Sequence, residues 1–187
     1  MSFSKERHGG VIDRYLTLYV KYLREKPVLT KAISSGLIAG LGDLIAQVIK
    51  YNPGKGQHIR LRSTAAFATF GFVFAGPLTH QFYIWLDQWV PKTASYCALK
   101  RIMIDRLILT PPYMLLFFYV VTVIEGHGFK MATQKIRETF WPVLQMNWKI
   151  WTLFQYVNVN YIPSEYRVLF ASCISLVWNI YLASTRR

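Results

Sequence analysis

The sequence has few of the residues that build covalent, metal-bound or acidic sites. Only two of its 187 residues are cysteines, and nine are aspartate or glutamate. Cys97 and Cys173 lie far apart and follow no metal-ligand spacing, so we expect neither a disulfide framework nor a metal site. The chain also has no phosphate-binding loop, nucleophile triad or dinucleotide fingerprint. We therefore expect no catalytic residues, no cofactor and no enzymatic activity.

The few acidic residues are outnumbered by 22 lysines and arginines, which gives a formal net charge of +13. In a soluble protein such an excess would suggest nucleic-acid binding. Here the basic residues gather at the N-terminus, in the first loop and near residues 92–101, where they flank apolar segments. Cationic side chains in those places meet lipid headgroups, so we expect a lipid bilayer as partner and no nucleic acid.

Apolar residues are abundant: 53% of the residues are hydrophobic, 16% are aromatic and only 17% are charged. Long apolar stretches alternate with short polar ones, and roughly 20 apolar residues are enough to cross a bilayer as a helix. We therefore predict an all-α integral membrane protein, one domain over residues 1–187, with about four transmembrane helices. The spans are expected at residues 28–49, 64–86, 102–124 and 167–184. An even number of spans places both termini on the same side.

Other segments have one apolar and one polar face at helical spacing. Residues 1–27 form a basic N-terminal segment, in which residues 11–25 are predicted to lie on the membrane as an amphipathic helix. Residues 129–140 are predicted to form a short surface helix. Residues 141–160 are also amphipathic, and such a helix lies at the interface or sits among other helices with its polar arc on water.

Small residues inside the predicted spans indicate where helices pack. Ala32, Gly36 and Gly40 have the small-xxx-small spacing that lets helix backbones approach closely in lipid. Gly76 and Pro77 interrupt the second span, and a proline inside a helix predicts a kink. We therefore expect Gly36, Gly40, Gly76 and Pro77 to serve helix packing.

Ionisable and amide side chains inside or beside the spans are candidates for a polar pathway, because such groups are costly in a bilayer. The alternative for each is structural: a buried hydrogen-bonded strut, a packed histidine, a local ion pair or an interfacial anchor. One ridge, residues 147, 151, 155 and 158, recurs at steps of four, four and three. The candidate pathway residues are Asp43, Gln47, His80, Asp87, Asp105, Arg106, Asn147, Lys149, Trp151, Gln155 and Asn158.

Several stretches together resemble a known family. They are YLREKPVLTKAISSG at residues 22–36, GFVFAGPLTH at 71–80, DRL at 105–107, and WP, NWKIW, QYVNVNYIP, YRVLF and WNIYL within 141–182. In this order they cover most of the chain and resemble the 22-kilodalton integral peroxisomal membrane protein family, in its peroxisomal branch. One departure is Thr152, where many relatives have proline.

The resemblance implies a multi-pass channel through which small water-soluble metabolites diffuse passively across the peroxisomal membrane, as a homo-oligomer, specifically a trimer. It also implies insertion by the cytosolic peroxisomal membrane-protein import receptor, which binds basic and apolar segments such as residues 5–31. Two alternatives stay open. In the first alternative, the chain is a non-conducting structural or assembly subunit. In the second, it lies in the mitochondrial inner membrane, as the other branch of the family does.

Overall fold

The structure, a computed structural model, describes residues 11–51, 58–91, 93, 95–162 and 167–185. Every regular element in these ranges is a helix, as the sequence predicts. Residues 1–10 of the predicted N-terminal segment lie outside the described residues. The elements are α1 (Val11–Glu25), α2 (Pro27–Lys50), α3 (Leu61–Phe70), the π-helical turn η2 (Gly71–Ala75), α4 (Gly76–Trp89), α5 (Cys97–Ile104), the π-helical turn η3 (Asp105–Leu109), α6 (Thr110–Ile124), α7 (Gly128–Asn160) and α8 (Arg167–Thr185).

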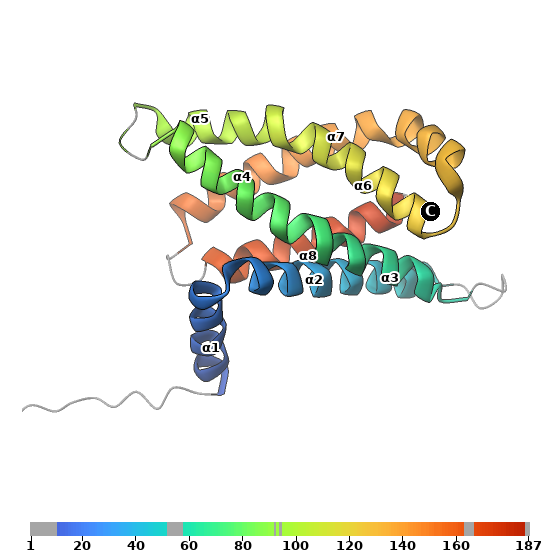
Figure 1. Ribbon diagram of the computed structural model, residues 1–187, viewed down its shortest axis with the longest axis horizontal. Helices are drawn as coiled ribbons and strands as arrows, with labels where there is room; N and C mark the ends of the chain where they lie inside the picture. The colour runs from blue at the N-terminus through green and yellow to red at the C-terminus, as the bar shows by residue number, and fades with distance from the viewer. Residues whose placement is uncertain (1–10, 52–57, 92, 94, 163–166, 186–187) are drawn as a thin grey trace, which may run out of the picture.

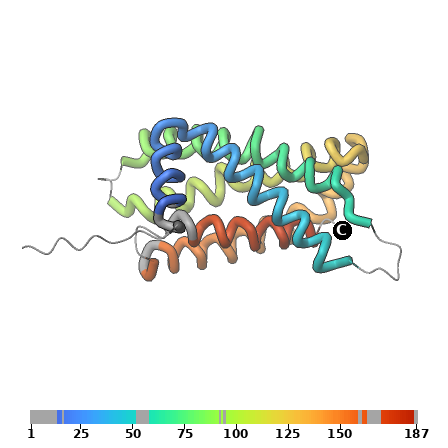
Figure 2. The backbone as a smooth tube through the Cα atoms, turned by 90° about the horizontal axis from the view of Figure 1, so that it is seen from below, coloured from blue at the N-terminus to red at the C-terminus, as the bar shows by residue number. Residues whose placement is uncertain are grey.

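In the described part of the chain, five helical rods lie along the long axis of the molecule (Figures 1 and 2). They are α2, the continuous run α3–η2–α4, the continuous run α5–η3–α6, α7 and α8. Each rod contacts the next, and α8 returns to contact α2, so the rods form a closed ring. Successive rods run in opposite directions, and α8 lies parallel to α2, where Lys50 Nζ donates a hydrogen bond to the carbonyl of Ser184.

Only part of the predicted set of spans is confirmed. By length and composition, two described helices qualify as membrane spans, at 27–50 and 97–124, in agreement with the spans expected at 28–49 and 102–124. Residues 170–185 form a shorter apolar helix, within the span expected at 167–184. The rod over residues 61–89, which includes Arg62, His80 and Asp87, is not among the candidate spans. Four spans are therefore not confirmed.

The structure corrects the prediction of a surface helix at 129–140 followed by a separate helix at 141–160, because α7 is one helix of 33 residues. Pro142 lies inside it. Packing on both sides of this proline, through the buried Ala132 and Val143, outweighs the hydrogen bond that proline cannot donate. The helix is about 50 Å long and runs lengthwise in the ring.

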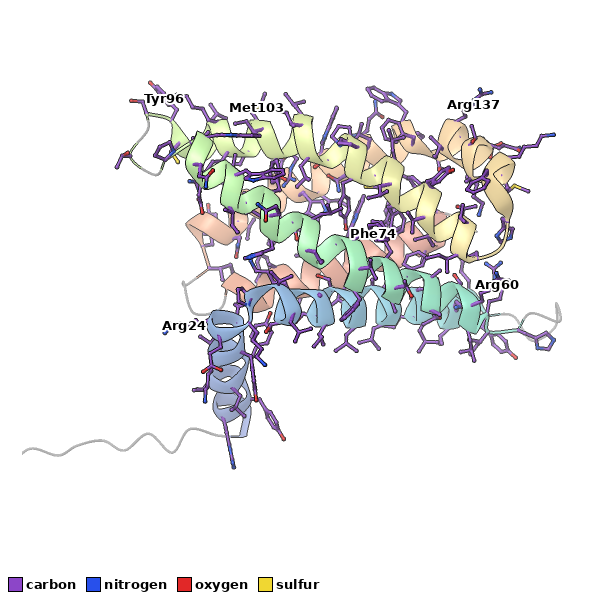
Figure 3. The ribbon with its side chains drawn as sticks, in the orientation of Figure 1. Arg24, Arg60, Phe74, Tyr96, Met103 and Arg137 are labelled. Atoms are coloured by element: carbon purple, nitrogen blue, oxygen red, sulfur yellow. The ribbon has the colours of Figure 1, made fainter. Side chains whose placement is uncertain are left out.

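An odd number of rods places the start of α2 and the C-terminal end of α8 at opposite ends of the ring. α1 lies at one end and the C-terminal end of α8 at the other (Figure 1). Arg24 and Tyr96 mark the first end, and Arg60 and Arg137 mark the second (Figure 3).

The helix predicted at residues 11–25 is confirmed as α1. It is roughly perpendicular to the rods and projects from the start of α2 away from the ring (Figure 1). Its apolar Tyr15, Leu18 and Tyr22 and its basic Arg14 and Arg24 are all exposed. This orientation is the one expected of an amphipathic helix that lies flat on the membrane surface while the rods cross it.

The ring is apolar on the outside where α2 and the α5–η3–α6 rod face outward. Leu37 and Leu41 on α2 are 63% and 51% exposed, and Met103 and Leu107 on the third rod are 48% and 54% exposed. Figure 3 shows Met103 directed away from the ring. In water, exposed apolar area costs about 25 cal/mol per Å², whereas lipid imposes no such cost. The fold is therefore that of a membrane protein.

α2 packs against the second rod through residues that have little or no side chain. A Cβ atom added at Gly76 would lie 2.5 Å from Ala32 Cα, and one added at Gly71 would lie 2.4 Å from the carbonyl oxygen of Ser35. A Cβ at Gly36 would lie 3.1 Å from a backbone oxygen of the second rod. The backbones of the two rods are therefore in direct contact, which only glycine permits at residues 71 and 76.

We expect Gly71→Ala to destabilise the fold by about 1–3 kcal/mol, because the added methyl group would overlap a backbone oxygen of α2. Gly40→Ala is a matched control in the same contact, where the new Cβ would lie 3.2 Å from the methyl group of Ala68. Both variants gain up to about 1 kcal/mol of helix propensity, so Gly40→Ala should be nearly neutral. Unfolding of the purified protein in detergent measures the difference. Equal stabilities would contradict this account of the contact.

Each π-helical turn lies just before a proline. η2 ends two residues before Pro77, and η3 ends two residues before Pro111. Proline lacks an N–H group and its ring collides with the carbonyl four residues earlier, and a wider turn relieves the collision. The hydroxyl of Thr110 donates to the carbonyl of Asp105 at 3.0 Å and so satisfies one acceptor in the widened turn. At Gly76-Pro77, where the sequence predicts a kink, the rod continues through η2.

Candidate functional site

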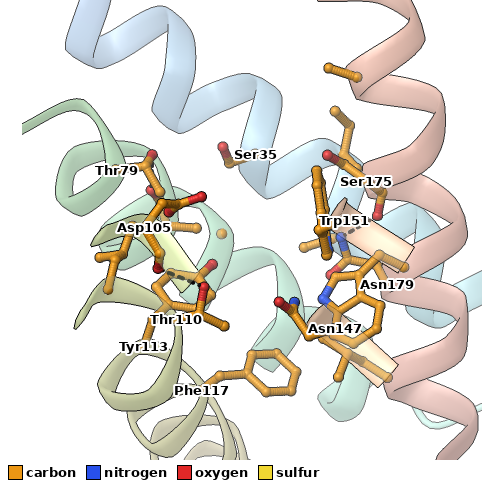
Figure 4. A pocket seen from close by; sticks show the side chains of 18 of the residues that line it. Ser35, Thr79, Asp105, Thr110, Tyr113, Phe117, Asn147, Trp151, Ser175 and Asn179 are labelled. Atoms are coloured by element: carbon orange, nitrogen blue, oxygen red, sulfur yellow. Dashed lines mark hydrogen bonds between the residues drawn. The ribbon is translucent and has the colours of Figure 1, made fainter. Parts of the chain in front are cut away.

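A partly open cavity of about 430 Å³ lies between the rods. This volume accommodates several water molecules. All five rods contribute to the wall, and Figure 4 shows side chains from opposite sides facing the same space. The polar lining consists of Ser35 on α2, Thr79 and Tyr83 on α4, Asp105, Arg106, Thr110 and Tyr113 on the third rod, Asn147, Gln155 and Asn158 on α7, and Ser175 and Asn179 on α8.

The charged part of the lining is an ion pair between neighbouring residues of η3. Arg106 Nη1 donates to Asp105 Oδ2 at 2.7 Å, and the two side chains are only 12% and 13% exposed. The Tyr83 hydroxyl is a further polar neighbour of the carboxylate. Charges this deeply buried require a partner, and the pair leaves the wall without net charge. The local pairing that the sequence suggests for these two residues is present.

Three polar atoms in the wall have no hydrogen-bond partner. Among the buried side-chain nitrogens and oxygens of the described residues, the unpaired atoms are Arg106 Nε, Asn147 Oδ1 and Asn158 Oδ1. All three belong to residues that line the cavity. A buried polar atom without a partner costs about 1–3 kcal/mol. The residues around the cavity therefore carry polar groups whose hydrogen-bonding capacity is not met within the protein.

α7 presents its polar ridge to the cavity. Its spacing of four, four and three residues keeps the ridge on one helix face. Figure 4 shows Asp105 and Thr110 on one side of the space, Ser175 and Asn179 on the other, and Asn147 directed between them. The ridge residues that line the cavity are Asn147, Trp151, Gln155 and Asn158.

Asp43 and Gln47 lie outside this cavity, in a separate buried polar cluster. Asp43 Oδ2 accepts hydrogen bonds from Gln47 Nε2 and Thr64 Oγ1, both at 2.8 Å, and Oδ1 accepts one from Ser63 Oγ at 3.0 Å. The backbone N–H of Arg60 donates to Gln47 Oε1 at 2.6 Å. These bonds join the C-terminal half of α2 to the start of α3.

Three further candidates from the sequence also lie away from the cavity. His80 Nδ1 is 3.0 Å from Lys31 Nζ, where α4 meets α2. Asp87 forms an ion pair with Arg101 at 2.7 Å. Lys149 is exposed on α7. The structure thus brings six of the eleven candidates to the cavity wall and leaves the other five outside it.

An aromatic group separates the cavity from the Asp43 cluster. The ring of Phe117 meets those of Phe67 and Phe70 edge to face, with centroids 5.3 and 5.1 Å apart. Phe70 and Phe117 line the cavity. Along the second rod, Phe67 and Phe70 lie between Ser63 of the cluster and Thr79 of the cavity wall. The cavity is therefore apolar at the side that faces the cluster.

Sequence patterns did not identify the hydroxyl groups of the wall or the amide of Asn179. Serine and threonine are ordinary in membrane helices because they bond to a carbonyl one turn earlier, as Thr79 Oγ1 does to the carbonyl of Ala75 at 2.6 Å. Their residue type alone does not indicate a cavity. The spacing of four between Ser175 and Asn179 on α8 was the one available signal, since it places two polar side chains on one face.

Comparison with known proteins finds relatives over nearly the whole chain. Residues 122–183 match the Mpv17 / PMP22 family. Peroxisomal membrane protein 2 of Bos taurus is 41% identical over 179 residues, which covers 94% of this chain and 91% of the relative. PXMP2/4 family protein 3 of Dictyostelium discoideum is 30% identical, with 96% and 95% covered. Protein SYM1 of Saccharomyces cerevisiae is 28% identical, with 91% and 89% covered. No solved structure matches.

Proposed function

We propose that this chain forms a channel for small water-soluble metabolites. It belongs to the Mpv17 / PMP22 family of membrane proteins. Solutes would diffuse through it passively. We place it in the peroxisomal membrane, the membrane in the name of its 41% identical bovine relative. The mitochondrial inner membrane is the alternative location, and fractionation of cells that produce the tagged protein distinguishes the two.

One observation carries this proposal: the unpaired buried polar atoms of the described side chains all belong to residues that line one cavity between the five rods. A polar interior spares a solute much of the cost of losing its water. The lining offers donors and acceptors from different rods, so a small solute replaces its hydration shell with wall groups. The wall carries no isolated charge that would hold a solute tightly, because Asp105 and Arg106 neutralise each other.

We also propose that the chain acts as a homo-oligomer, with the trimer implied by the family resemblance, and that the import receptor binds within residues 5–31. The exposure of the basic and apolar side chains of α1 supports the second point, since Arg14, Leu18 and Arg24 are all accessible to a partner.

Purified protein reconstituted in liposomes should release an entrapped small metabolite faster than empty liposomes do. Asn147→Leu should slow the release about tenfold, the effect of about 1.4 kcal/mol on a barrier, because it removes an unpaired acceptor from the cavity wall and keeps the branched side-chain shape. Gln81→Leu is the matched control, since this amide is exposed on α4 outside the cavity. Release no faster than from empty liposomes would favour the non-conducting structural or assembly subunit.

A further inference from the structure

A second pocket lies at the end of the ring that Arg60 and Arg137 mark, away from the polar cavity. Its volume is about 410 Å³. The start of α3 and the turn between α6 and α7 form its wall, and none of its residues lines the first cavity. The proposed channel therefore does not account for it. The lining consists of Arg60, Leu61, Arg62, Ser63, Glu125 and His127.

The guanidinium group of Arg62 is fixed on the turn between α6 and α7. Arg62 Nε donates to the carbonyl of Ile124 at 2.9 Å. A Cβ atom added at Gly126 would lie 2.7 Å from Nη1 and 2.8 Å from Nη2 of Arg62, so the group lies directly against this glycine. Among the described residues, neither Nη1 nor Nη2 donates a hydrogen bond. The two terminal nitrogens form a held fork of donors without an acceptor in the described part of the chain.

Positive charge exceeds negative charge in this pocket. Arg60 and Arg62 are both exposed, and arginine is always charged. Glu125 is the one acid of the lining, and its side chain is only 8% exposed. Its Oε1 accepts a hydrogen bond from Ser63 Oγ at 2.7 Å, and its Oε2 lies 3.8 Å from His127 Nδ1. The carboxylate is thus turned inward, and the open side of the pocket presents the two guanidinium groups.

The pocket lies at the level where a membrane span ends. Ile124, whose carbonyl accepts the bond from Arg62, is the last residue of the candidate span at 97–124. Leu61, between the two arginines, is 71% exposed. An exposed apolar side chain beside exposed cationic groups matches the border between acyl chains and headgroups.

We propose that this pocket binds a phosphate group, supplied in the membrane by a phospholipid headgroup. A guanidinium fork binds two oxygens of one phosphate at once. Because Arg62 is already held in place, little side-chain freedom is lost when the phosphate binds. With His127 neutral, the pocket has an excess of one positive charge, which matches the single negative charge of a phosphodiester. The bound lipid would join α3 to the α6–α7 turn, whether or not the chain conducts solutes.

Thermal unfolding of the full-length chain in neutral detergent tests the site. A short-chain phosphatidylglycerol should raise the unfolding temperature, and more than inorganic phosphate does at the same concentration. Arg60→Gln should weaken lipid binding about tenfold, because it removes one charge-assisted contact. This variant keeps the fold, since Arg60 bonds Gln47 through its backbone N–H. Arg137→Gln is the matched control, an exposed arginine at the same end outside the pocket (Figure 3). Equal weakening in both variants would overturn the proposal.

Arg62→Lys tests the fork itself. Lysine keeps the positive charge but donates from a single nitrogen, so lipid affinity should fall about tenfold. Unchanged affinity would overturn the site. Native mass spectrometry supplies a measurement that does not depend on stability: the unaltered protein and Arg137→Gln should retain a phospholipid that Arg60→Gln and Arg62→Lys lose. Equal retention in all four proteins would also overturn it. Equal stabilisation by inorganic phosphate and by the lipid would support a phosphate site and assign it to a soluble ligand.

Discussion

Phe117→Ala should increase the release of small solutes from liposomes about tenfold, which corresponds to removal of about 1.4 kcal/mol from the barrier. Phe117 lines the polar cavity and meets Phe67 and Phe70 edge to face. Apolar constrictions oppose the passage of water and polar solutes because they dewet. Removal of the central ring of this group would extend the polar cavity toward the Asp43 cluster, so passage should become easier although a buried side chain is lost.

The neighbouring Phe118→Ala is the control for this experiment. Phe118 is completely buried, like Phe117, but it does not line the cavity. Both substitutions remove a buried ring and should cost about 3–5 kcal/mol of stability. If loosened packing alone caused the leak, the two variants would release solute equally. Faster release from Phe117→Ala only would identify the aromatic group as the barrier.

Asp43→Leu should destabilise the protein by several kcal/mol, because Gln47, Ser63 and Thr64 would lose a common acceptor in a fully buried place. Ser63 Oγ keeps a bond to Glu125 Oε1 and Gln47 Nε2 keeps one to the carbonyl of Arg60, whereas the loss of a buried acceptor costs about 1–3 kcal/mol for each donor left unpaired, and leucine adds apolar bulk among polar groups. Asp87→Leu is the matched control. The Asp87 side chain is 60% exposed in its ion pair with Arg101, and such exposed pairs contribute about 0–1 kcal/mol. Unfolding in detergent, followed by circular dichroism, measures both variants.

Equal stability losses in these two variants would mean that the Asp43 cluster is not a structural joint. Asp43→Asn separates this role from a role in the pathway, since it keeps the side-chain shape. Because Asp43 does not line the cavity, solute release by Asp43→Asn should stay near that of the unaltered protein. A decrease in solute release as large as that expected for Asn147→Leu would indicate that Asp43 and Gln47 belong to the proposed pathway.

Much of the local structure could be predicted from the sequence. Apolar runs indicated the helices at 27–50 and 97–124, and the polar and apolar faces of residues 11–25 indicated α1. These features are local, because helix length and the face of each side chain follow from 3.6 residues per turn. The continuity of α7 could not be predicted in this way. Whether Pro142 ends a helix depends on packing from other rods, and the sequence around it does not contain that information.

The candidate site was predictable to a smaller degree. The ridge on α7 was visible as a periodic pattern, and it lines the cavity. Asp43 belongs to the same chemical class as Asp105, and both are acids within helices that qualify as spans. Yet Asp43 is enclosed by hydroxyl and amide groups, whereas Asp105 and its partner Arg106 face the cavity. Periodicity could not separate these two acids, because it records the angle of a side chain about its own helix and not which helix lies opposite.

By itself, the sequence determined that this is a helical membrane protein, because apolar runs and flanking basic residues are properties of single segments. The tertiary structure decided how those segments are used. In the tertiary structure the described helices form five rods that close into a ring. Their packing determines which polar faces line the cavity and which face outward. The physical reason is that these outcomes depend on contacts between distant residues, such as Gly71 against Ser35 and Trp148 against Arg106.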